Sequence, residues 1–262
     1  MEGYFEVFRD LNFSMHLATE INNNFDAHYH SNIEITFVEE GEIEITVGKY
    51  TDVLKAGELS VADSYDCHSY TTPKYSKTKI MIIPLEMVGS FARLSKQRTF
   101  SYPFCRDKKV TTEIAKMISG LERADENNAL ASKGYLYVIL GLLCASLGVR
   151  ERAGAEGGAG AMRDMLLYIE QHFRESVTIS LLAKKFGYNR DYLSRLFNST
   201  LGIGFRKHVN ILRSRSAANL LRDTGDPISD IAYSSGFSSQ RTFNRAFRDL
   251  YGVTPAEYRA GF

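Results

Sequence analysis

The strongest constraint on the fold is an apolar, glycine-punctuated pattern that occurs twice between Ile179 and Arg259. Each copy has an apolar run, a glycine, a second apolar run and a second glycine, and one extra residue follows the first glycine of the second copy. A repeat this short, present as a pair, indicates duplicated supersecondary units and not a solenoid. The matched positions are Ile179, Leu182, Ala183, Gly187, Leu193, Leu196, Phe197 and Gly202, then Ile228, Ile231, Ala232, Gly236, Phe243, Ala246, Phe247 and Gly252.

The first glycine of each copy, Gly187 or Gly236, falls where a tight turn between two short helices needs a residue that tolerates positive φ. Ser180 and Ser229 occupy equivalent positions near the start of the first helix, and we expect their hydroxyls to cap it. Each copy therefore predicts one helix-turn-helix unit.

Charge is distributed unevenly along the 262 residues. Residues 161–262 carry 15 Lys and Arg against 9 Asp and Glu, a net charge of +6, which leaves −5 for residues 1–160. A basic half joined to an acidic half indicates an anionic partner for the basic half, either nucleic acid or a membrane surface.

The second helix of each copy is expected to bury an apolar stripe and to leave its opposite face free. Arg on such a face can pair with guanine, and Gln or Asn can pair with adenine, in the major groove. Because arginine recurs at equivalent positions 195 and 245, this face predicts binding to a double-stranded DNA operator. The predicted DNA-binding residues are Arg190, Asp191, Ser194, Arg195 and Asn198 in the first unit, and Gln240, Arg241, Thr242, Asn244 and Arg245 in the second.

Further helices are expected around the two copies. One covers residues 162–173, and a long one covers 205–223 between the copies. Thr254-Pro255-Ala256-Glu257 has a capping-box pattern that starts the last helix. A continuous helix between the units is stiff, so the two reading helices could enter successive major grooves about 34 Å apart.

Residues 162–259 resemble the double helix-turn-helix domain of the AraC/XylS family of transcription regulators. The resemblance implies an effector-responsive regulator, more often an activator that helps to recruit RNA polymerase. Asp191 departs from the pattern, because an aspartate there would repel phosphate and could accept only from cytosine. The motifs that carry the resemblance are Leu-Ala-x-x-x-Gly-Tyr from Leu182, Ile-Ala-x-x-x-Gly-Phe from Ile231, Arg213 with Ala217 and Leu220-Leu221, Phe243 to Phe247, and Gly252 to Pro255.

Alternating apolar and polar residues from Asp26 to His68 predict β-strands. The alternation breaks at Glu40-Gly41 and then resumes, which predicts a β-hairpin that turns there. With two later strands, a small antiparallel barrel or sandwich is the simplest fold. The apolar positions of the hairpin are Ile33, Ile35, Phe37, Ile43, Ile45 and Val47, and the later strands are Glu58–Ala62 and Lys79–Ile83.

His28, His30 and Glu34 share the even-numbered face of these strands. Over about residues 20–85 the chain resembles a cupin, through His-x-His-x-x-x-Glu, Gly41, Gly57 and a later His68, although Ser64 stands where a proline is usual. Two interpretations stay open: a divalent transition metal held by the histidines and the carboxylate, or a metal-free pocket for a sugar or an aromatic metabolite. We favour the second, without a cofactor. The predicted effector-binding residues are His28, His30, Glu34, Tyr65 and His68, and a metal would use His28, His30, Glu34 and His68.

The sequence leaves other classes of protein open besides a ligand-sensing regulator. No further arrangement of acid, base or nucleophile appears, so we do not expect an enzyme. The alternatives are a metal-dependent cupin enzyme fused to a DNA-binding module, and a metal or redox sensor that works through the histidines or Cys67. The three cysteines are far apart and lack C-x-x-C spacing, which favours reduced thiols and a cytoplasmic protein. Residues 1–10 show no signal-peptide pattern, and the stretch Tyr135–Val149 is expected to be too short to span a membrane.

Two helices are expected after the strands, over Thr111–Ala124 and Leu130–Val149. The second carries Leu136, Leu140, Leu143 and Leu147 at spacings of 4, 3 and 4, which predicts a seam between the protomers of a homodimer unless the leucines pack on their own barrel. The fold class is therefore multidomain α and β, with an antiparallel cupin-like barrel followed by an all-α domain. The expected domains are 1–105 for the effector-binding barrel, 106–150 for the helical dimerisation segment, 151–161 for a flexible linker and 162–262 for the double helix-turn-helix domain.

Overall fold

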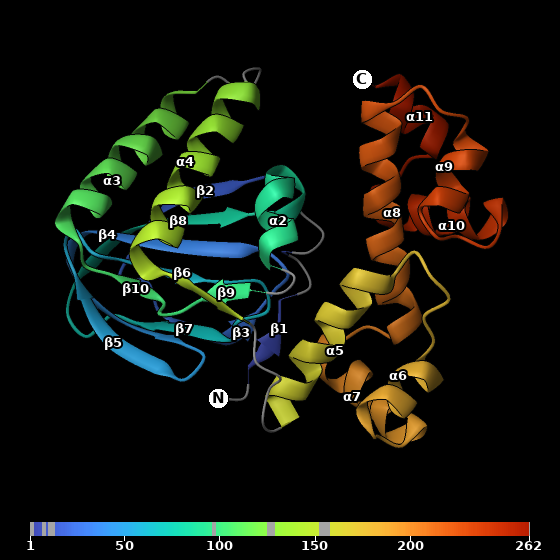
Figure 1. Ribbon diagram of the computed structural model, residues 1–262, viewed down its shortest axis with the longest axis horizontal. Coiled ribbons are helices and arrows are strands. Elements are labelled where there is room, and N and C mark those ends of the chain that lie inside the picture. Colours follow the sequence, from blue (N-terminus) through green and yellow to red (C-terminus); the bar gives the residue numbers. More distant parts are fainter. Residues whose placement is uncertain are drawn as a thin grey trace. The chain divides into compact units, whose positions relative to one another are not determined.

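The computed structural model describes residues 3–6, 9, 14–95, 98–124, 129–151 and 158–261 (Figure 1). The chain divides into two compact units, an amino-terminal unit of Met1–Ala155 and a carboxyl-terminal unit of Glu156–Phe262. The expected linker, 151–161, falls mostly on residues outside this description, and its last residues, 158–161, already belong to a helix.

The sheet of the amino-terminal unit is organised on β4 (Ile33–Val47), a strand of 15 residues. The first part of β4 pairs with two strands and its second part pairs with two others, all antiparallel. Each remaining strand of this sheet joins one of these neighbours. The neighbours of the first part are β6 (Leu59–Ala62) and β8 (Ser76–Ile83), and those of the second part are β5 (Tyr50–Lys55) and β7 (His68–Thr71). The outer strands are β1 (Tyr4–Phe5), β2 (His16–Ile21), β3 (Phe25–Tyr29) and β10 (Phe104–Cys105).

The hairpin expected at Glu40-Gly41 is wrong, because both of its segments belong to β4. Gly41 has a φ of 73°, and the register of β4 against β8 shifts between Val38 and Glu40, so the backbone bulges and bends without reversing. A Cβ on Gly41 would lie 2.1 Å from the carbonyl oxygen of Tyr75, which leaves room only for glycine.

The bend in β4 changes which residues face the interior. Before it, the even-numbered Val38 points into a buried cluster, and after it the odd-numbered Ile43 and Ile45 join the same cluster. The first part of β4 thus lies in one sheet, with β6 and β8, and its second part lies in the other, with β5 and β7. The antiparallel, sheet-rich domain expected from the sequence is confirmed, and the described strands pair in an open path with no closed ring of hydrogen bonds among them.

Helices α3 (Lys108–Arg123) and α4 (Ala129–Leu147) lie side by side over one face of the sheet (Figure 1). The Asp107 carboxylate caps α3 by accepting from the backbone N–H of Lys109 at 2.9 Å. The shorter η1 (Leu85–Val88) and α2 (Gly89–Ser95) pack into the same core, and β11 (Val149–Glu151) pairs with β9 (Arg98–Phe100) after α4 ends. The residues of these helices buried in the core are Val88, Phe91, Ile114, Ile118, Leu121, Leu136, Ile139, Leu140 and Leu143.

The dimer seam predicted on α4 is wrong as placed. Leu136, Leu140 and Leu143 are at most 2% exposed because they pack on the unit's own sheet. The expected shortness of the apolar stretch is also wrong, since α4 is the one helix among the described residues that is long and apolar enough to cross a membrane. One face of α4 packs in the core of this unit, and 22% of the apolar stretch is buried.

We predict that Leu140→Ala lowers the free energy of unfolding of the amino-terminal unit by about 2–5 kcal/mol, because it leaves a cavity in a packed core. The matched control is Val138→Ala on the same helix, where the side chain is 47% exposed and the expected change is within about 0.5 kcal/mol. Urea unfolding followed by circular dichroism measures both. If Leu140→Ala left the stability unchanged but weakened self-association, these leucines would form a contact between protomers after all.

The carboxyl-terminal unit is all helical, and α8 (Phe205–Asp223) has the bounds expected from the sequence. Figure 1 shows α5, α6 and α7 near one end of α8 and α9, α10 and α11 near the other. The bounds are α5 (Gly158–His172), α6 (Ile179–Phe186), α7 (Arg190–Leu201), α9 (Ile228–Ser234), α10 (Gln240–Tyr251) and α11 (Pro255–Ala260).

The helix caps follow the sequence only in part. The capping box at Thr254 and Glu257 is present, with both reciprocal hydrogen bonds. The caps expected at Ser180 and Ser229 are wrong, because both residues lie inside their helices. Thr178 caps α6 through a 3.1 Å bond from the Leu181 N–H, and α9 begins after Pro227 without a side-chain cap.

Candidate functional site

Helices α7 and α10 are built alike. Each has 12 residues, follows a left-handed glycine (Gly187, φ 74°, or Gly236, φ 90°) and ends on another left-handed glycine. Asn189 caps α7 through its side-chain oxygen, and Ser239 caps α10 in the same way. Each helix therefore begins and ends at a defined residue, so the face that it exposes is set by its buried stripe.

Each of these helices buries one stripe and exposes the other. Leu193 and Phe197 on α7, and Phe243 and Phe247 on α10, have no exposed surface. Eight of the ten predicted DNA-binding residues are exposed on the remaining surface, and Ser194 and Thr242 are partly buried. The Thr242 hydroxyl accepts a 3.0 Å hydrogen bond from Ser239, so this residue also supports the cap of α10.

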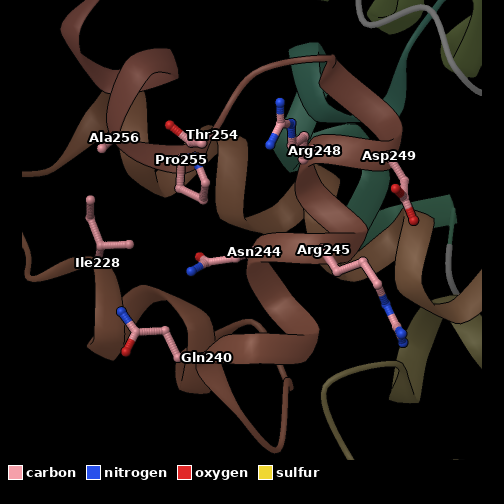
Figure 2. Close-up of a pocket in the computed structure, with 9 residues that line it drawn as sticks. All are labelled: Ile228, Gln240, Asn244, Arg245, Arg248, Asp249, Thr254, Pro255 and Ala256. Atoms are coloured by element: carbon pink, nitrogen blue, oxygen red, sulfur yellow. The ribbon is translucent and has the colours of Figure 1, made fainter.

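A groove of about 500 Å³ lies beside α10 (Figure 2). Gln240 and Asn244 extend from α10 toward Ile228 across the groove, and Arg245 extends away from them. Arg248 lines the same groove, although the predicted set omits it. The lining of this groove therefore combines donors and acceptors suited to base edges with two guanidinium groups, those of Arg245 and Arg248.

Asp191 makes α7 chemically different from α10. It lies in the first turn of α7, where a carboxylate is stabilised by the positive end of the helix dipole. Arg241 stands at the matching place in α10. The aspartate thus stabilises the start of α7 but weakens the attraction of its exposed face for phosphate.

In the amino-terminal unit the structure brings His28, His30, Glu34 and His68 together. All four are between 1% and 3% exposed, and their potential ligand atoms lie within 4.8 Å of one another. The strand register explains this, because His28 on β3 faces His68 on β7 directly. Glu34 enters from the start of β4, on the even-numbered face that the sequence indicates.

Hydrogen bonds orient the rings of this cluster. His28 Nδ1 lies 2.9 Å from the Asp26 carbonyl oxygen, and His68 Nδ1 lies 2.8 Å from the Asp66 carbonyl oxygen. A carbonyl oxygen only accepts, so both Nδ1 atoms carry hydrogen, and when these rings are neutral their Nε2 atoms hold a free lone pair. Glu34 Oε2 lies 3.0 Å from His30 Nε2 and 3.4 Å from His68 Nε2.

The buried carboxylate sets the electrostatics of the cluster. Burial alone would raise the pKa of Glu34, but the charge of His68 and the hydrogen bonds of His30 and His68 outweigh it and hold that pKa well below its usual range. Burial alone would lower the pKa of His68, and the Glu34 carboxylate overcomes it and raises that pKa. Burial, aided by His68, lowers the pKa of His28 to about 3. A buried negative charge therefore requires a positive partner, which is either a proton on His68 or a bound cation.

The donor set fits a divalent transition metal. Imidazole nitrogens and a carboxylate oxygen are the ligands that such ions prefer, and metal-bound histidines usually donate their second N–H to a carbonyl, as His28 and His68 do here. His28, His30, Glu34 and His68 would hold the ion, which would supply the positive charge that Glu34 requires.

Sequence reasoning left other members of this site out of the predicted set. The Tyr70 hydroxyl donates to Glu34 Oε1 at 2.6 Å, and burial followed by the Glu34 charge raises the pKa of that phenol well above its usual range. Tyr70 lies two residues after His68 on β7, so both side chains are on the same face of the strand. The spacing of two could therefore have placed Tyr70 in the site. Glu6 Oε2 lies 3.9 Å from His28 Nε2, and Phe5 packs on Tyr29 at 5.5 Å between ring centroids. Phe5 ends β1, which pairs in parallel with β3, and Glu6 follows it directly; no local pattern predicts that pairing.

Tyr65, the fifth predicted effector-binding residue, is 2% exposed and stacks on Phe5 at 6.4 Å. Its backbone N–H donates to the His30 carbonyl at 2.8 Å, so it adjoins the cluster through the main chain. His30 Nδ1 and Ser64 Oγ are buried without a hydrogen-bond partner among the described residues. Buried polar atoms are normally bonded, so these two are available to a ligand or to water.

Comparison with known proteins agrees with both halves. The family model of an AraC-like ligand binding domain matches residues 10–140, and that of a helix-turn-helix domain matches residues 182–261. The HTH-type transcriptional activator RhaS of Enterobacter sp. (strain 638) is 26% identical over 249 residues, which cover 90% of this chain and 88% of that protein. The right origin-binding protein of Escherichia coli (strain K12) is 38% identical over 101 residues, 38% of this chain and 35% of that protein. A crystal structure of ToxT from Vibrio cholerae, 16% identical, covers 95% of this chain and 98% of its own, with a TM-score of 0.41.

The ligand-binding match accounts for half of the chain, and the helix-turn-helix match covers most of the carboxyl-terminal unit. The chain therefore belongs to the AraC family of effector-responsive, DNA-binding transcription regulators.

Proposed function

We propose that this regulator activates transcription when a small molecule binds at the buried histidine and glutamate cluster. The observation that carries the DNA-binding part is the pair of matched helices, α7 and α10, which expose arginine, asparagine and glutamine. The two helices insert into successive major grooves of tandem half-sites, with α10 as the stronger reader because α7 carries Asp191.

Activation is supported by the full-length relationship to a protein named as an activator. An activator of this kind acts by contact with RNA polymerase at the promoter. We also propose that the chain works in the cytoplasm, where bacterial promoters are found, and that it is not an enzyme.

The effector acts only if it binds more tightly to one arrangement of the protein than to another. The cluster suits that requirement, since its charged groups are buried and His30 and Ser64 each have an atom open to a ligand. A small polar metabolite such as a sugar could bond to these atoms, and Tyr65 lies next to them in the fold.

We predict that Arg245→Ala weakens specific operator binding by about 1–3 kcal/mol, because a bidentate contact to guanine is lost. Arg195→Ala, the matched change on α7, should weaken operator binding less than Arg245→Ala does. Gel-shift titration at fixed salt, on an operator selected from random DNA by the full-length protein, measures both.

The control for these variants is Arg222→Ala on α8, whose guanidinium donates to Asn219 and Asp223 of its own helix. It also removes one positive charge, and its operator affinity should stay within about twofold. Equal affinities for wild type and Arg245→Ala would refute the assignment of α10 as the main reader.

We further propose a homodimer through the outer face of α4. Its exposed residues include Leu130 (83%), Tyr137 (38%) and Val138 (47%), and the small residues Gly134, Gly141 and Ala145 lie on the same exposed side. Small residues allow a partner helix to approach closely. We predict a dimer in sedimentation equilibrium at micromolar concentration and a monomer for Val138→Glu; a monomeric wild type contradicts the proposal.

A divalent transition metal is the second candidate for the effector. It is favoured by one observation, namely four donor groups within 4.8 Å of one another around a carboxylate that needs a positive partner. In that case the ion itself, and not an organic molecule, would be sensed.

Elemental analysis of protein purified without chelator or added metal separates the two candidates. A metal effector predicts about one ion per chain in wild type, almost none in His68→Ala, and a wild-type content in the control His172→Gln, which alters a histidine of the other unit. An organic effector predicts metal-free protein. It also predicts that some metabolite in a thermal-shift screen stabilises wild type by about 2.7 kcal/mol at one hundred times its Kd, but fails to stabilise His30→Ala.

A further inference from the structure

The segment between α5 and α6, residues 173–178, is held by a side chain from the middle of α8. Arg213 Nε donates to the Phe173 carbonyl oxygen at 2.7 Å, and Arg213 Nη2 donates to the Glu175 carbonyl oxygen at 2.8 Å. These carbonyls follow the carboxyl end of α5, where unpaired acceptors and the negative end of the helix dipole favour a cation. One planar guanidinium thus fixes two points of the segment.

The same guanidinium also contacts the second helix-turn-helix unit. Its central carbon lies 6.0 Å from the ring centroid of Phe237, which is 2% exposed. Phe237 packs on Phe243 of α10, with 5.2 Å between ring centroids. Arg213 therefore connects the entry to α6, in the first unit, with the residue that supports the first turns of α10, in the second.

A backbone contact reinforces this junction. A Cβ added to Gly236 would lie 2.6 Å from Arg174 Cα, so the turn between α9 and α10 rests directly on the segment that precedes α6. Arg174 in turn donates to the Ser216 hydroxyl of α8 at 3.0 Å. Two helix-turn-helix units that could be joined by α8 alone are in fact joined by a second, shorter route.

Partial burial affects the strength of the contacts that Arg213 makes. Arg213 is half-buried, and burial lowers the pKa of its guanidinium from the ordinary value. The bond from Nε to the Phe173 carbonyl is partly buried and therefore less screened by water and salt than a surface pair, whereas the bond from Nη2 to the Glu175 carbonyl is exposed.

We propose that Arg213 is a positioning residue that sets the orientation of α7 relative to α10, and hence the spacing of the two half-sites that the regulator accepts. Arg213 does so without touching DNA. This inference rests on the proposed function, because it requires both units to bind DNA together. Each base pair rotates the duplex by about 34–36°, so a rigid pair of reading helices tolerates one spacing and a loosened pair tolerates several.

The test uses the full-length protein and three duplexes made from its selected operator. The first has the selected spacing, the second has one base pair inserted between the half-sites, and the third has only the half-site read by α10. The variants are Arg213→Met, which removes both hydrogen bonds, and Arg213→Lys, which keeps the charge but loses the fork. Arg222→Met, on an exposed part of the same helix, is the matched control. Fluorescence anisotropy at fixed salt gives the affinities.

We expect the insertion to weaken wild-type binding by about tenfold or more, since one half-site is lost from simultaneous contact. For Arg213→Met the penalty of the insertion should fall to about threefold or less, while affinity for the single half-site stays within about twofold of wild type. Arg213→Lys should be intermediate and Arg222→Met should match wild type. Because the penalty is a ratio measured on one preparation, partial unfolding of a variant lowers both affinities alike and cancels.

The inference would be overturned if the inserted base pair weakened DNA binding by Arg213→Met as much as it weakens binding by wild type. Equal loss on all three duplexes would overturn it as well, because it would show a purely structural role. If wild type itself binds the operator no better than the single half-site, then the proposed engagement of both units fails, and the inference fails with it for that separate reason.

Discussion

The carboxyl-terminal unit depends on the packing of both helix-turn-helix units against α8. Ala217, Ala218 and Leu221 of this helix form a buried cluster with Ile231, Phe237, Phe243 and Phe247 of the second unit. Small alanines let α9 and α10 approach the helix closely, and the phenylalanines fill the remaining space. Because this face of α10 is fully used in packing, its opposite face is available for a partner.

The amino-terminal unit depends on a comparable constraint, the bend of β4 at Gly41. The bend lets one strand belong to two sheets, so that residues far apart in the sequence converge on a single interior. Glu34 lies on the first part of β4, and His68 lies on β7, which pairs with the second part. A buried carboxylate among three histidines results, and its charge requires a positive partner, either a proton on His68 or a bound cation.

Much of this could be predicted from the sequence because the relevant signals are local. The bounds of α8 follow from a run without glycine or proline between two breaks, and the turn glycines of the repeat adopt the positive φ that their position requires. The cluster could be predicted because His28, His30 and Glu34 are close in sequence and all have even numbers, although His28 lies on β3 and Glu34 on β4. Its role as an effector site stays a prediction.

The errors have physical causes. A glycine in a bulge and a glycine in a hairpin turn look alike in a sequence, so Gly41 was misplaced. Helix α4 is apolar on nearly every side, so periodicity could not show whether Leu140 faces the sheet or a second protomer. The contacts of Phe5, Glu6 and Arg213 are made across long stretches of chain, and no local spacing encodes them.

The central claim is that α7 and α10 read DNA together. Hydroxyl-radical footprinting of the full-length protein on its selected operator tests this most directly. If both helices bind, two protected segments are expected about one helical turn, or 10–10.5 base pairs, apart on one face of the duplex. A single protected segment, or two segments on opposite faces, would contradict it.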